Sequence, residues 1–484
     1  MIGRLSQLSA AWARRWVPDP FVLAILLTTA VFAWAVASGA PAAALVGVWG
    51  GKQGLWQTAF MEFLVQMVLV LVTGHALAST RPVRRLIDAL AVRPTTPRGA
   101  VALTAFVACA AGLLNWGLAL IVGALLARQV GASCRARGVR IHYPLVVAAG
   151  YSGLLVWHGG LSGSAPLKVT GAADVANVLR DPEVVARVGA LVAERTAEGF
   201  ADGRIPLSLT LLSPSNLVVC ALALLVVPLL FVLMTPAADA PAEALQEMDP
   251  DVARAALAPE VVEPTGAAGP MTPAGRLEAT RLLPAIIVAL GAAHLGQRVW
   301  TEGAFGVLQR LDLDTINLTF LLLGLGLHGS AQAYGRAVAE AIPGAAGIVL
   351  QFPLYFGIMG LMSASGLVGA VAERMVALSR GAEWAYPVLT FFSAGLVNFF
   401  VPSGGGQWAI QGPIVLTGAA SLGVDPGRAV MALAYGDQWT NMAQPFWALP
   451  LLGICGVKAG DIMGYTLVVM VLSVPVFVLP VLLL

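Results

Sequence analysis

Long apolar blocks alternate with short polar segments along almost the whole chain. Each block approaches or exceeds the roughly 20 apolar residues that an α-helix needs to cross a bilayer. Because the blocks are continuous rather than alternating, they predict helices and not a transmembrane β-barrel. The predicted apolar segments are residues 20–39, 58–79, 99–127, 144–164, 205–234, 282–300, 315–328, 344–363, 386–421, 428–453 and 462–484. This pattern predicts an all-α polytopic membrane protein.

Two polar stretches interrupt the apolar pattern. Residues 165–204 hold six acids and five bases and predict an extramembrane helical loop. Residues 235–281 hold eight acids, three arginines and many Pro and Ala, so they predict a solvated linker. The resulting predicted organisation is an amphipathic N-terminal segment (1–19), a first transmembrane repeat (20–234), a cytoplasmic linker (235–281), a connecting helix and loop (282–314) and a second, inverted repeat (315–484).

The two halves of the chain repeat weakly. Residues 111–116 match residues 394–399 at an offset of 283. Further matches keep the same order at offsets of 284 to 286: Tyr151 with Tyr435, Pro166 with Pro450, Gln66 with Gln351, and 103–106 with 389–392. An internal repeat in a membrane protein indicates a secondary transporter.

The basic residues predict the orientation of the chain. The segments 1–19, 81–98 and 128–143 carry three, five and four Lys or Arg, whereas residues 40–57 carry one. The three basic segments therefore face the cytoplasm. Both ends of 99–127 then lie on one side, which predicts a re-entrant hairpin. When the alternation of membrane sides is continued along the chain, it predicts about nine crossings and a second, opposed hairpin at 386–421. The N-terminus then lies inside and the C-terminus outside.

Composition excludes several other classes of protein. Of the 484 residues, 58% are apolar and 11% charged, against about 25% charged in soluble domains. The net charge is +2 with scattered basic residues, so nucleic acid is not an expected partner. The four cysteines lie far apart and predict neither disulfides nor a zinc site. The start of the chain, with Trp12 and Trp16 beside Arg14 and Arg15, predicts a helix on the bilayer surface.

The strongest local signal is the glycine run within residues 401–408, inside the second predicted hairpin. Pro402 and three consecutive glycines stop a helix and let a ligand approach the backbone. A helix restarting at Gln407 would aim its N-terminal N–H groups at the break, which suits a carboxylate. The alternative is a glycine turn made only for packing. Asn115 and Trp116 occupy the equivalent turn of the other half.

The segments after the two hairpins carry the remaining polar candidates. The first ends in an unwound, hydroxyl-rich run containing His158, Ser162 and Ser164. In the second, Asp437 and Asn441 lie at helical spacing, and an acid inside a span is functional by default. Asp437 is therefore predicted as a coupling-cation ligand or titrating group; a structural role remains the alternative. His158 is predicted to take part in ion coupling, with a satisfied structural hydrogen bond as its alternative.

The predicted substrate-binding residues are Ser403, Gly404, Gly405, Gly406, Gln407, Asn115, Trp116, Asn398, Ser162, Ser164, Asn441 and Gln444. The predicted ion-coupling residues are Asp437, Asn115, Asn398 and His158. Metal-protease and phosphate-binding-loop signatures do not occur, so the chain is predicted not to be an enzyme and to need no cofactor or metal.

Several long runs resemble one transporter family. The runs 15–20, 73–79, 401–406 and 441–450 are similar to those of AtoE-type short-chain fatty acid transporters of bacterial inner membranes, and the resemblance extends nearly end to end. That family is grouped with the ion-transporter superfamily. The resemblance therefore implies inverted repeats with two re-entrant hairpins. Dicarboxylate members of the superfamily carry Ser-Asn-Thr at the hairpin tips for sodium, and this triplet is missing here.

The resemblance and the residues together predict cation-coupled uptake of small monocarboxylates such as acetoacetate or butyrate. The coupling ion, H+ or Na+, and a homo-oligomeric state are left open. The alternatives are an intramembrane hydrolase or acyltransferase that uses His158 and a serine, and a passive anion channel. Ser403–Gly406, Asn398 and Asn115 are expected to meet near the bilayer midplane.

Overall fold

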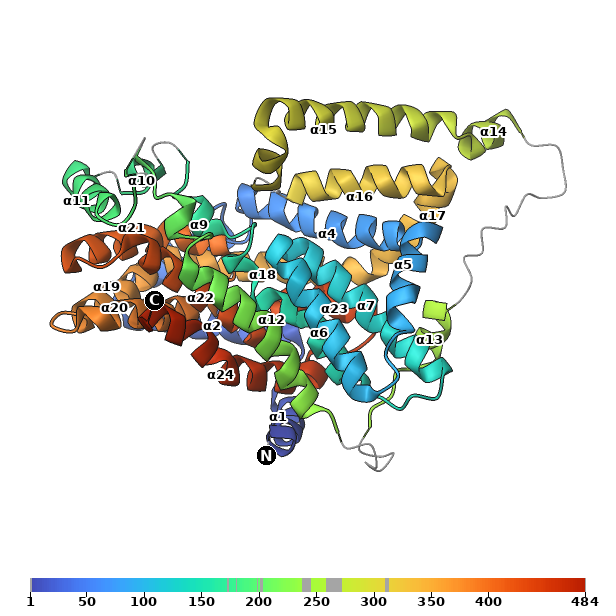
Figure 1. Ribbon diagram of the computed structural model, residues 1–484, viewed down its shortest axis with the longest axis horizontal. Helices are drawn as coiled ribbons and strands as arrows, with labels where there is room; N and C mark the ends of the chain where they lie inside the picture. Colours follow the sequence, from blue (N-terminus) through green and yellow to red (C-terminus); the bar gives the residue numbers. More distant parts are fainter. Residues whose placement is uncertain are drawn as a thin grey trace.

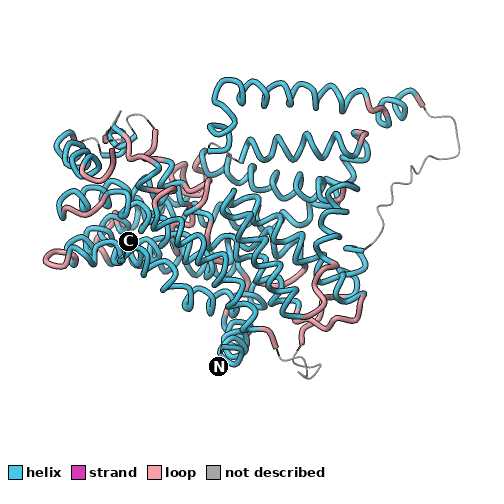
Figure 2. Tube along the Cα trace, viewed as in Figure 1, coloured by secondary structure: helices cyan, strands magenta, loops and turns pink. Residues whose placement is uncertain are grey.

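The computed structural model describes residues 2–171, 174–179, 181–197, 199–200, 203–236, 245–257, 272–309 and 313–483. These residues form helices joined by turns, and none of them belongs to a β-strand (Figure 2). The α-helices are α1 (Ile2–Trp16), α2 (Pro20–Ala37), α3 (Ala42–Gly50), α4 (Thr58–Ala78), α5 (Arg81–Ala91), α6 (Pro97–Leu114), α7 (Trp116–Ala136), α8 (Tyr143–Tyr151), α9 (Ser164–Leu167), α10 (Asp174–Leu179), α11 (Pro182–Ala193), α12 (Pro214–Met234), α13 (Pro250–Leu257), α14 (Pro273–Ala279), α15 (Leu282–Gln309), α16 (Leu313–His328), α17 (Ala331–Ala341), α18 (Ala346–Ala364), α19 (Leu367–Leu378), α20 (Tyr386–Asn398), α21 (Gly404–Leu422), α22 (Pro426–Thr440), α23 (Pro445–Cys455) and α24 (Ala459–Leu483).

The prediction of an all-α, multi-pass membrane protein is confirmed. Nine helical segments of the described chain are long and apolar enough to cross a membrane. The sequence analysis also predicts about nine crossings, but the nine helical segments are not the same ones. The nine segments include α6 and α7 separately, whereas α16 and α23 are shorter apolar helices.

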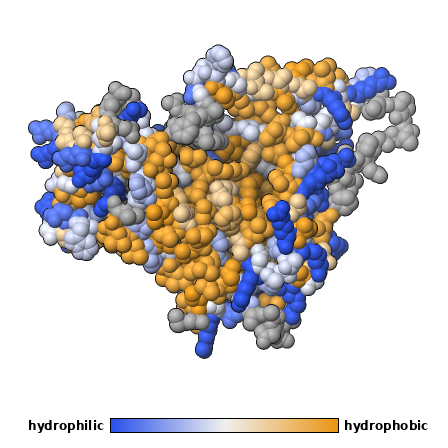
Figure 3. All heavy atoms as spheres, viewed as in Figure 1, coloured by the Kyte–Doolittle hydropathy of each residue, from blue (hydrophilic) through white to orange (hydrophobic). Residues whose placement is uncertain are grey.

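The helices are arranged between two polar ends. In Figure 1, α5, α13, α14 and α17 lie at one end and α10, α11, α19 and α21 at the other. On the face that Figure 3 shows, hydrophobic side chains cover most of the surface between these ends. Along one edge α15, α16 and α4 run side by side, and the outer helix α15 is mostly exposed. This arrangement is that of a bundle whose apolar middle faces lipid.

The cores of the two halves pack in the same way. A Cβ added to Gly153 would lie 2.5 Å from the carbonyl oxygen of Ala108, and one added to Gly436 would lie 2.0 Å from that of Phe391. Both members of the second pair follow those of the first at the 283-residue offset of the sequence repeat. Small residues allow backbones to approach this closely in membrane helices. The shared contact supports the repeat; its inversion remains a prediction.

Two predicted spans are interrupted. The first unwinds, as predicted, but from Ser152 rather than near its end, and the division of the second corrects the prediction of one continuous span. The span predicted at 144–164 stops being α-helical at Tyr151 and continues as two 3-10 turns. The span predicted at 428–453 is divided between α22 and α23. Pro445 restricts Gln444 to extended backbone, with φ −106° and ψ 108°, so the helix ends before it. Consequently Asp437, Asn441 and Gln444 do not share one face of a single helix.

The two predicted hairpins each contain a break flanked by helices that pack on one another. Asn115 separates α6 from α7, and residues 399–403 separate α20 from α21. Because α6 and α7 are each long enough to cross a membrane, the re-entrant insertion stays a prediction. The domain boundaries also remain predictions, and much of the 235–281 linker lies outside the described residues.

The predicted orientation can be tested with single cysteines. We expect Ala136→Cys, at the end of α7, to be shielded from a membrane-impermeant thiol reagent added to intact cells. Glu183→Cys, at the start of α11, should react, because both positions are exposed but lie at opposite ends of the bundle. Permeabilised cells provide the control for reactivity. Labelling of both from outside would contradict the first hairpin and the inverted repeat.

Candidate functional site

A cavity of about 80 Å³ lies where the two helix breaks meet. Its lining residues are Phe63, Trp116, Leu154, Trp157, Ser164, Ser403, Gly404, Gly405, Asn441 and Trp447. They come from both halves of the chain, and six of them are predicted substrate-binding residues. The structure thus brings together Trp116 and Ser164 of the first half with Ser403, Gly404 and Asn441 of the second.

The glycine break is organised by Ser403. This residue is the N-cap of α21, and its Oγ accepts a hydrogen bond from the N–H of Gly406 at 3.2 Å. The helix therefore restarts at Gly404 and not, as predicted, at Gln407. The first turn of a helix leaves N–H groups without intrahelical partners, and the positive end of the helix dipole lies there. The N–H groups of the first turn are consequently suited to a carboxylate.

The glycines of the break have different surroundings. A Cβ on Gly404 would lie 2.7 Å from the Trp157 ring and 3.0 Å from Cε1 of His158. A Cβ on Gly405 would have no atom within 4 Å. Gly404 thus permits contact between the two unwound segments, whereas Gly405 borders the open space of the cavity.

Gln407 lies away from the cavity. Its Nε2 donates to the carbonyl oxygen of Ala394 at 2.9 Å and to Oε1 of Gln411 at 2.7 Å. Because α21 begins as early as Gly404, the side chain of Gln407 joins α21 to α20. The geometry therefore gives Gln407 a packing role between those helices.

At the first break, the predicted residues mainly cap backbone. Oδ1 of Asn115 accepts from the N–H groups of Gly117 at 2.8 Å and Leu118 at 3.1 Å. Oγ of Ser162 accepts from the N–H of Trp116 at 3.1 Å. Of these side chains only the indole of Trp116 lines the cavity, so Asn115 and Ser162 position it.

Aromatic rings form the walls of the cavity. The centroid of Trp116 lies 5.3 Å from that of Trp447, 6.0 Å from Phe63 and 6.3 Å from Trp157. Such edge and tilted contacts hold large side chains in fixed positions. Of these rings the site prediction contained only Trp116, although Trp157 lies beside His158 and Trp447 lies within the run 441–450. Phe63 lies in an apolar run without a polar or glycine signal.

A buried histidine–aspartate pair lies beside the break. His158 Nδ1 is 2.6 Å from Oδ2 of Asp437, and both side chains are at most 1% exposed. The N–H of Ala165 donates to Nε2 of His158 at 2.9 Å. Since Nε2 accepts, the proton of the neutral ring is on Nδ1 and is donated to the carboxylate. The pair then carries the single negative charge of Asp437.

Three side chains that the site prediction did not include hold the unwound segment that carries His158: Gln438, Asn216 and Tyr435. Oε1 of Gln438 accepts from the N–H groups of His158 at 2.8 Å and Gly159 at 3.2 Å. Nδ2 of Asn216 donates to the carbonyl oxygen of Gly159 at 2.9 Å, and Tyr435 donates to Oδ1 of Asn216 at 2.8 Å. The sequence carries a signal that could have identified two of these residues. Tyr435 is one member of the repeated tyrosine pair, and Asn216 is a polar residue in an apolar span.

The second unwound segment is held by the first half of the chain. The hydroxyl of Tyr151 donates to the carbonyl oxygens of Asn441 at 2.8 Å and Gln444 at 2.9 Å. Nδ2 of Asn398 donates to Oδ1 of Asn441 at 2.8 Å and to the carbonyl oxygen of Asp437 at 2.7 Å. Gln444 Nε2 in turn donates to the carbonyl oxygen of Asn398. Each repeated tyrosine therefore supports the unwound segment of the opposite half.

Three acceptor oxygens in this network are buried without a donor among the described residues: Asp437 Oδ1, Asn398 Oδ1 and Gln444 Oε1. Buried polar atoms without partners are rare and call for an explanation, such as a proton, an ion or water. The described residues contain no cluster of three His, Cys, Asp or Glu side chains that could hold a metal. By their chemistry, carboxylate and amide oxygens suit a proton or a hard cation better than a transition metal.

Comparisons with known proteins agree on one family. The family model described as "Short chain fatty acid transporter" matches residues 1–484. The "Putative short-chain fatty acid transporter" of Escherichia coli (strain K12) is 39% identical over 480 residues, covering 99% of both chains. The protein of the same name from Haemophilus influenzae is 36% identical over 482 residues, again covering 99% of both chains.

Two solved structures are also similar to this chain. MtrF of Neisseria gonorrhoeae, described within a class of antimetabolite efflux pumps, has a TM-score of 0.42 and 12% identity, over 97% of this chain and 96% of MtrF. The YdaH transporter of Alcanivorax borkumensis has a TM-score of 0.39 and 16% identity, over 96% of this chain and 98% of YdaH.

The contrast between the neighbouring glycines predicts opposite effects on stability. Gly404→Val should destabilise the purified protein by about 1–3 kcal/mol, because its Cβ overlaps Trp157. Gly405→Val adds the same side chain in the same helical turn but meets open space, so it should change stability by less than about 0.5 kcal/mol. Thermal unfolding in detergent measures both variants. Equal destabilisation would show that Gly405 is also enclosed by packing.

Proposed function

The chain belongs to the short-chain fatty acid transporter family, and on that premise we propose that it takes up small monocarboxylates, such as acetoacetate or butyrate, by cation-coupled secondary transport. The family and the curated relatives are transporters, so the alternative of an intramembrane hydrolase or acyltransferase is wrong. The protein is a multi-pass membrane protein, consistent with the bacterial inner membrane. The observation that carries the proposal is that one small cavity is lined by residues at both helix breaks.

The substrate carboxylate is proposed to bind at the start of α21. The N-terminal turn of this helix begins with Gly404 and Gly405, both of which line the cavity. Without side chains, these residues leave their N–H groups accessible to the oxygens of an anion. The hydroxyls of Ser403 and Ser164 border the same space and can donate further hydrogen bonds.

The size and walls of the cavity suit a short acyl chain. One water needs roughly 10–15 Å³ of such space, so a volume of about 80 Å³ admits a ligand of only a few heavy atoms. The indoles of Trp116, Trp157 and Trp447 provide apolar surface for the tail of the acid. A longer acid would have to displace these rings, which are packed against one another. Short monocarboxylates are therefore the substrate class we propose.

The coupling cation is proposed to bind at Asp437. A buried carboxylate with an unpartnered oxygen is unfavourable by several kcal/mol unless a proton or cation neutralises it. Asn398, which donates to the backbone oxygen of Asp437, and Gln444, which donates to that of Asn398, carry two further unpartnered oxygens. A substrate anion in the neighbouring cavity would add a second negative charge, so cation and anion each favour binding of the other. This reciprocal effect is the proposed basis of coupling.

Reconstitution in proteoliposomes tests the proposed function. We expect labelled butyrate to accumulate above its external concentration when an inward H+ or Na+ gradient is imposed, and an ionophore to abolish accumulation. Gly405→Val should abolish uptake, because the valine side chain fills the cavity. Downhill flux that is indifferent to ionophores would instead support the passive channel.

The proposed role of Asp437 is tested separately, through the dependence of uptake on pH and sodium. Asp437→Asn keeps the shape of the side chain but removes its charge, so uptake should lose its dependence on pH or sodium while butyrate exchange persists. Asp181→Asn is the matched control, because Asp181 is an exposed N-cap of α11 and asparagine caps equally well. The measurement is initial uptake across a series of pH values and sodium concentrations. Unchanged ion dependence in Asp437→Asn would make Asp437 structural.

A further inference from the structure

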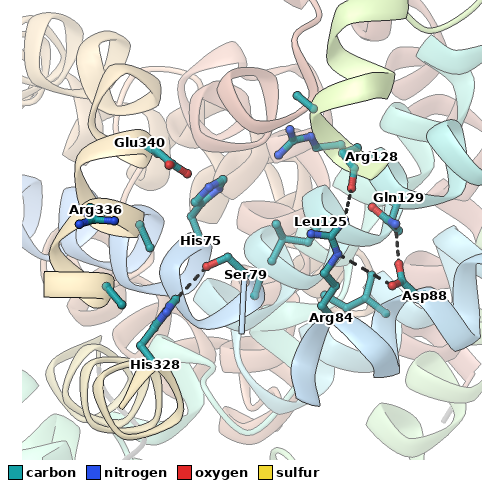
Figure 4. Close-up of a pocket in the computed structure, with 16 residues that line it drawn as sticks. His75, Ser79, Arg84, Asp88, Leu125, Arg128, Gln129, His328, Arg336 and Glu340 are labelled. Atoms are coloured by element: carbon teal, nitrogen blue, oxygen red, sulfur yellow. Dashed lines mark hydrogen bonds and ion pairs between the residues drawn. The ribbon is translucent and has the colours of Figure 1, made fainter. Parts of the chain in front are cut away.

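A second and larger cavity, of about 510 Å³, lies at the arginine-rich end of the molecule (Figure 4). It shares no lining residue with the 80 Å³ cavity. Its walls come from α4, α5, α7, α13, α16 and α17. The sequence reading did not select it, because its charged residues are far apart along the chain.

Part of its charge is already compensated. Arg84 donates to the carbonyl oxygen of Ala256 at 3.0 Å and lies 4.0 Å from Asp88. Gln129 Nε2 donates to the other oxygen of Asp88. Arg84 and Asp88 therefore already have partners within the protein, at one side of the cavity.

Arg128 is not compensated in this way. Its Nε is buried and has no hydrogen-bond acceptor among the residues that the structure describes. In the same residues no carboxylate lies within ion-pair distance of its guanidinium, although Glu340 lines the cavity. Figure 4 shows Arg128, His75 and Glu340 around the same space. Arg128 is half-buried. Arginine stays charged in proteins, so a guanidinium that lines a cavity without a carboxylate partner favours binding of an anion.

The position of Arg128 relates this cavity to the smaller one. Helix α4 carries Phe63 at the small cavity and His75 at the large one, and α7 carries Trp116 and Arg128 in the same order. In both helices the two residues are twelve positions apart, about 18 Å along the axis. The same two helices thus lead from the substrate cavity to the arginine-rich end, which the charge distribution predicts to be cytoplasmic.

We propose that the large cavity is a second carboxylate-binding site, on the cytoplasmic route of the transported monocarboxylate, with Arg128 as its anchor. This inference rests on the proposed function. A guanidinium can bind both oxygens of a carboxylate at once. The cavity is much wider than the substrate cavity, so it holds the anion by charge and does not select chain length. Arg336 also lines the cavity, where Glu340 opposes its charge, so Arg128 carries the uncompensated positive charge.

Protection of a single cysteine tests the site directly. Ala333 lines the cavity from α17, and Ala333→Cys places a thiol there. The rate of its reaction with a thiol reagent is measured in purified protein with sodium butyrate, sodium chloride or sodium phosphate at equal ionic strength. The unsubstituted protein gives the background from the native cysteines, three of which are buried. We expect butyrate to slow labelling at least threefold relative to chloride.

Variants of two arginines test whether protection by butyrate depends on Arg128. Arg128→Gln in the Ala333→Cys background should remove protection by butyrate, whereas Arg93→Gln, which changes an exposed arginine outside the cavity, should retain it. If Arg128→Gln does not fold, Arg128→Lys keeps the charge but loses the two-pronged donor, and protection should weaken severalfold. Protection that is the same in chloride, or unaffected by either Arg128 variant, overturns the proposal. Protection by phosphate alone also overturns it, since the site would then serve another anion.

Failure of this inference can be distinguished from failure of the proposed function. In proteoliposomes, Arg128→Gln should raise KM for butyrate presented at the cytoplasmic face about three- to tenfold and change the opposite face little. If the unsubstituted protein carries no monocarboxylate, the proposed function fails whatever the protection result. If it transports butyrate but butyrate never protects Ala333→Cys, only the second site is wrong.

Discussion

Backbone that leaves the helix inside a membrane protein must find its hydrogen-bond partners within the protein, because lipid offers none. The rest of this structure depends on how that requirement is met. Tyr151, in the first half, donates to the unwound carbonyls of Asn441 and Gln444 in the second. Tyr435, in the second half, supports Gly159 in the first through Asn216. Neither unwound segment finds all its partners within its own half, so the two halves assemble around one site.

Contact between the two halves also places the charged side chain of Asp437 beside the site. His158 comes from the unwound segment of the first half and Asp437 from α22 of the second, so their contact exists only when the halves are joined. A backbone N–H on Nε2 fixes the ring as a donor to the carboxylate. The oxygen of Asp437 that remains unpartnered is where a proton or cation would act. In our account, coupling follows from the electrostatics of one buried charge and needs no long-range network.

The sequence predicted elements better than it predicted contacts. Apolar length located the spans, and the glycine run located the break at Ser403, because both signals are local. It did not show that the helix restarts at Gly404, which decides that Gln407 packs between helices. It also missed Phe63 and Trp447, since an aromatic residue in an apolar span looks the same whether it faces lipid or a cavity. Long-range packing supplies that distinction.

Direct localisation of a bound short acid tests the central claim, that the two helix breaks form one monocarboxylate site. A structure solved with 3-bromopropionate would show the halogen by its anomalous signal. Our account predicts the bromine among Trp116, Trp157 and Trp447, with the carboxylate toward the N–H groups of Gly404 and Gly405. A bromine signal elsewhere in the membrane region, with none in this cavity, would contradict it.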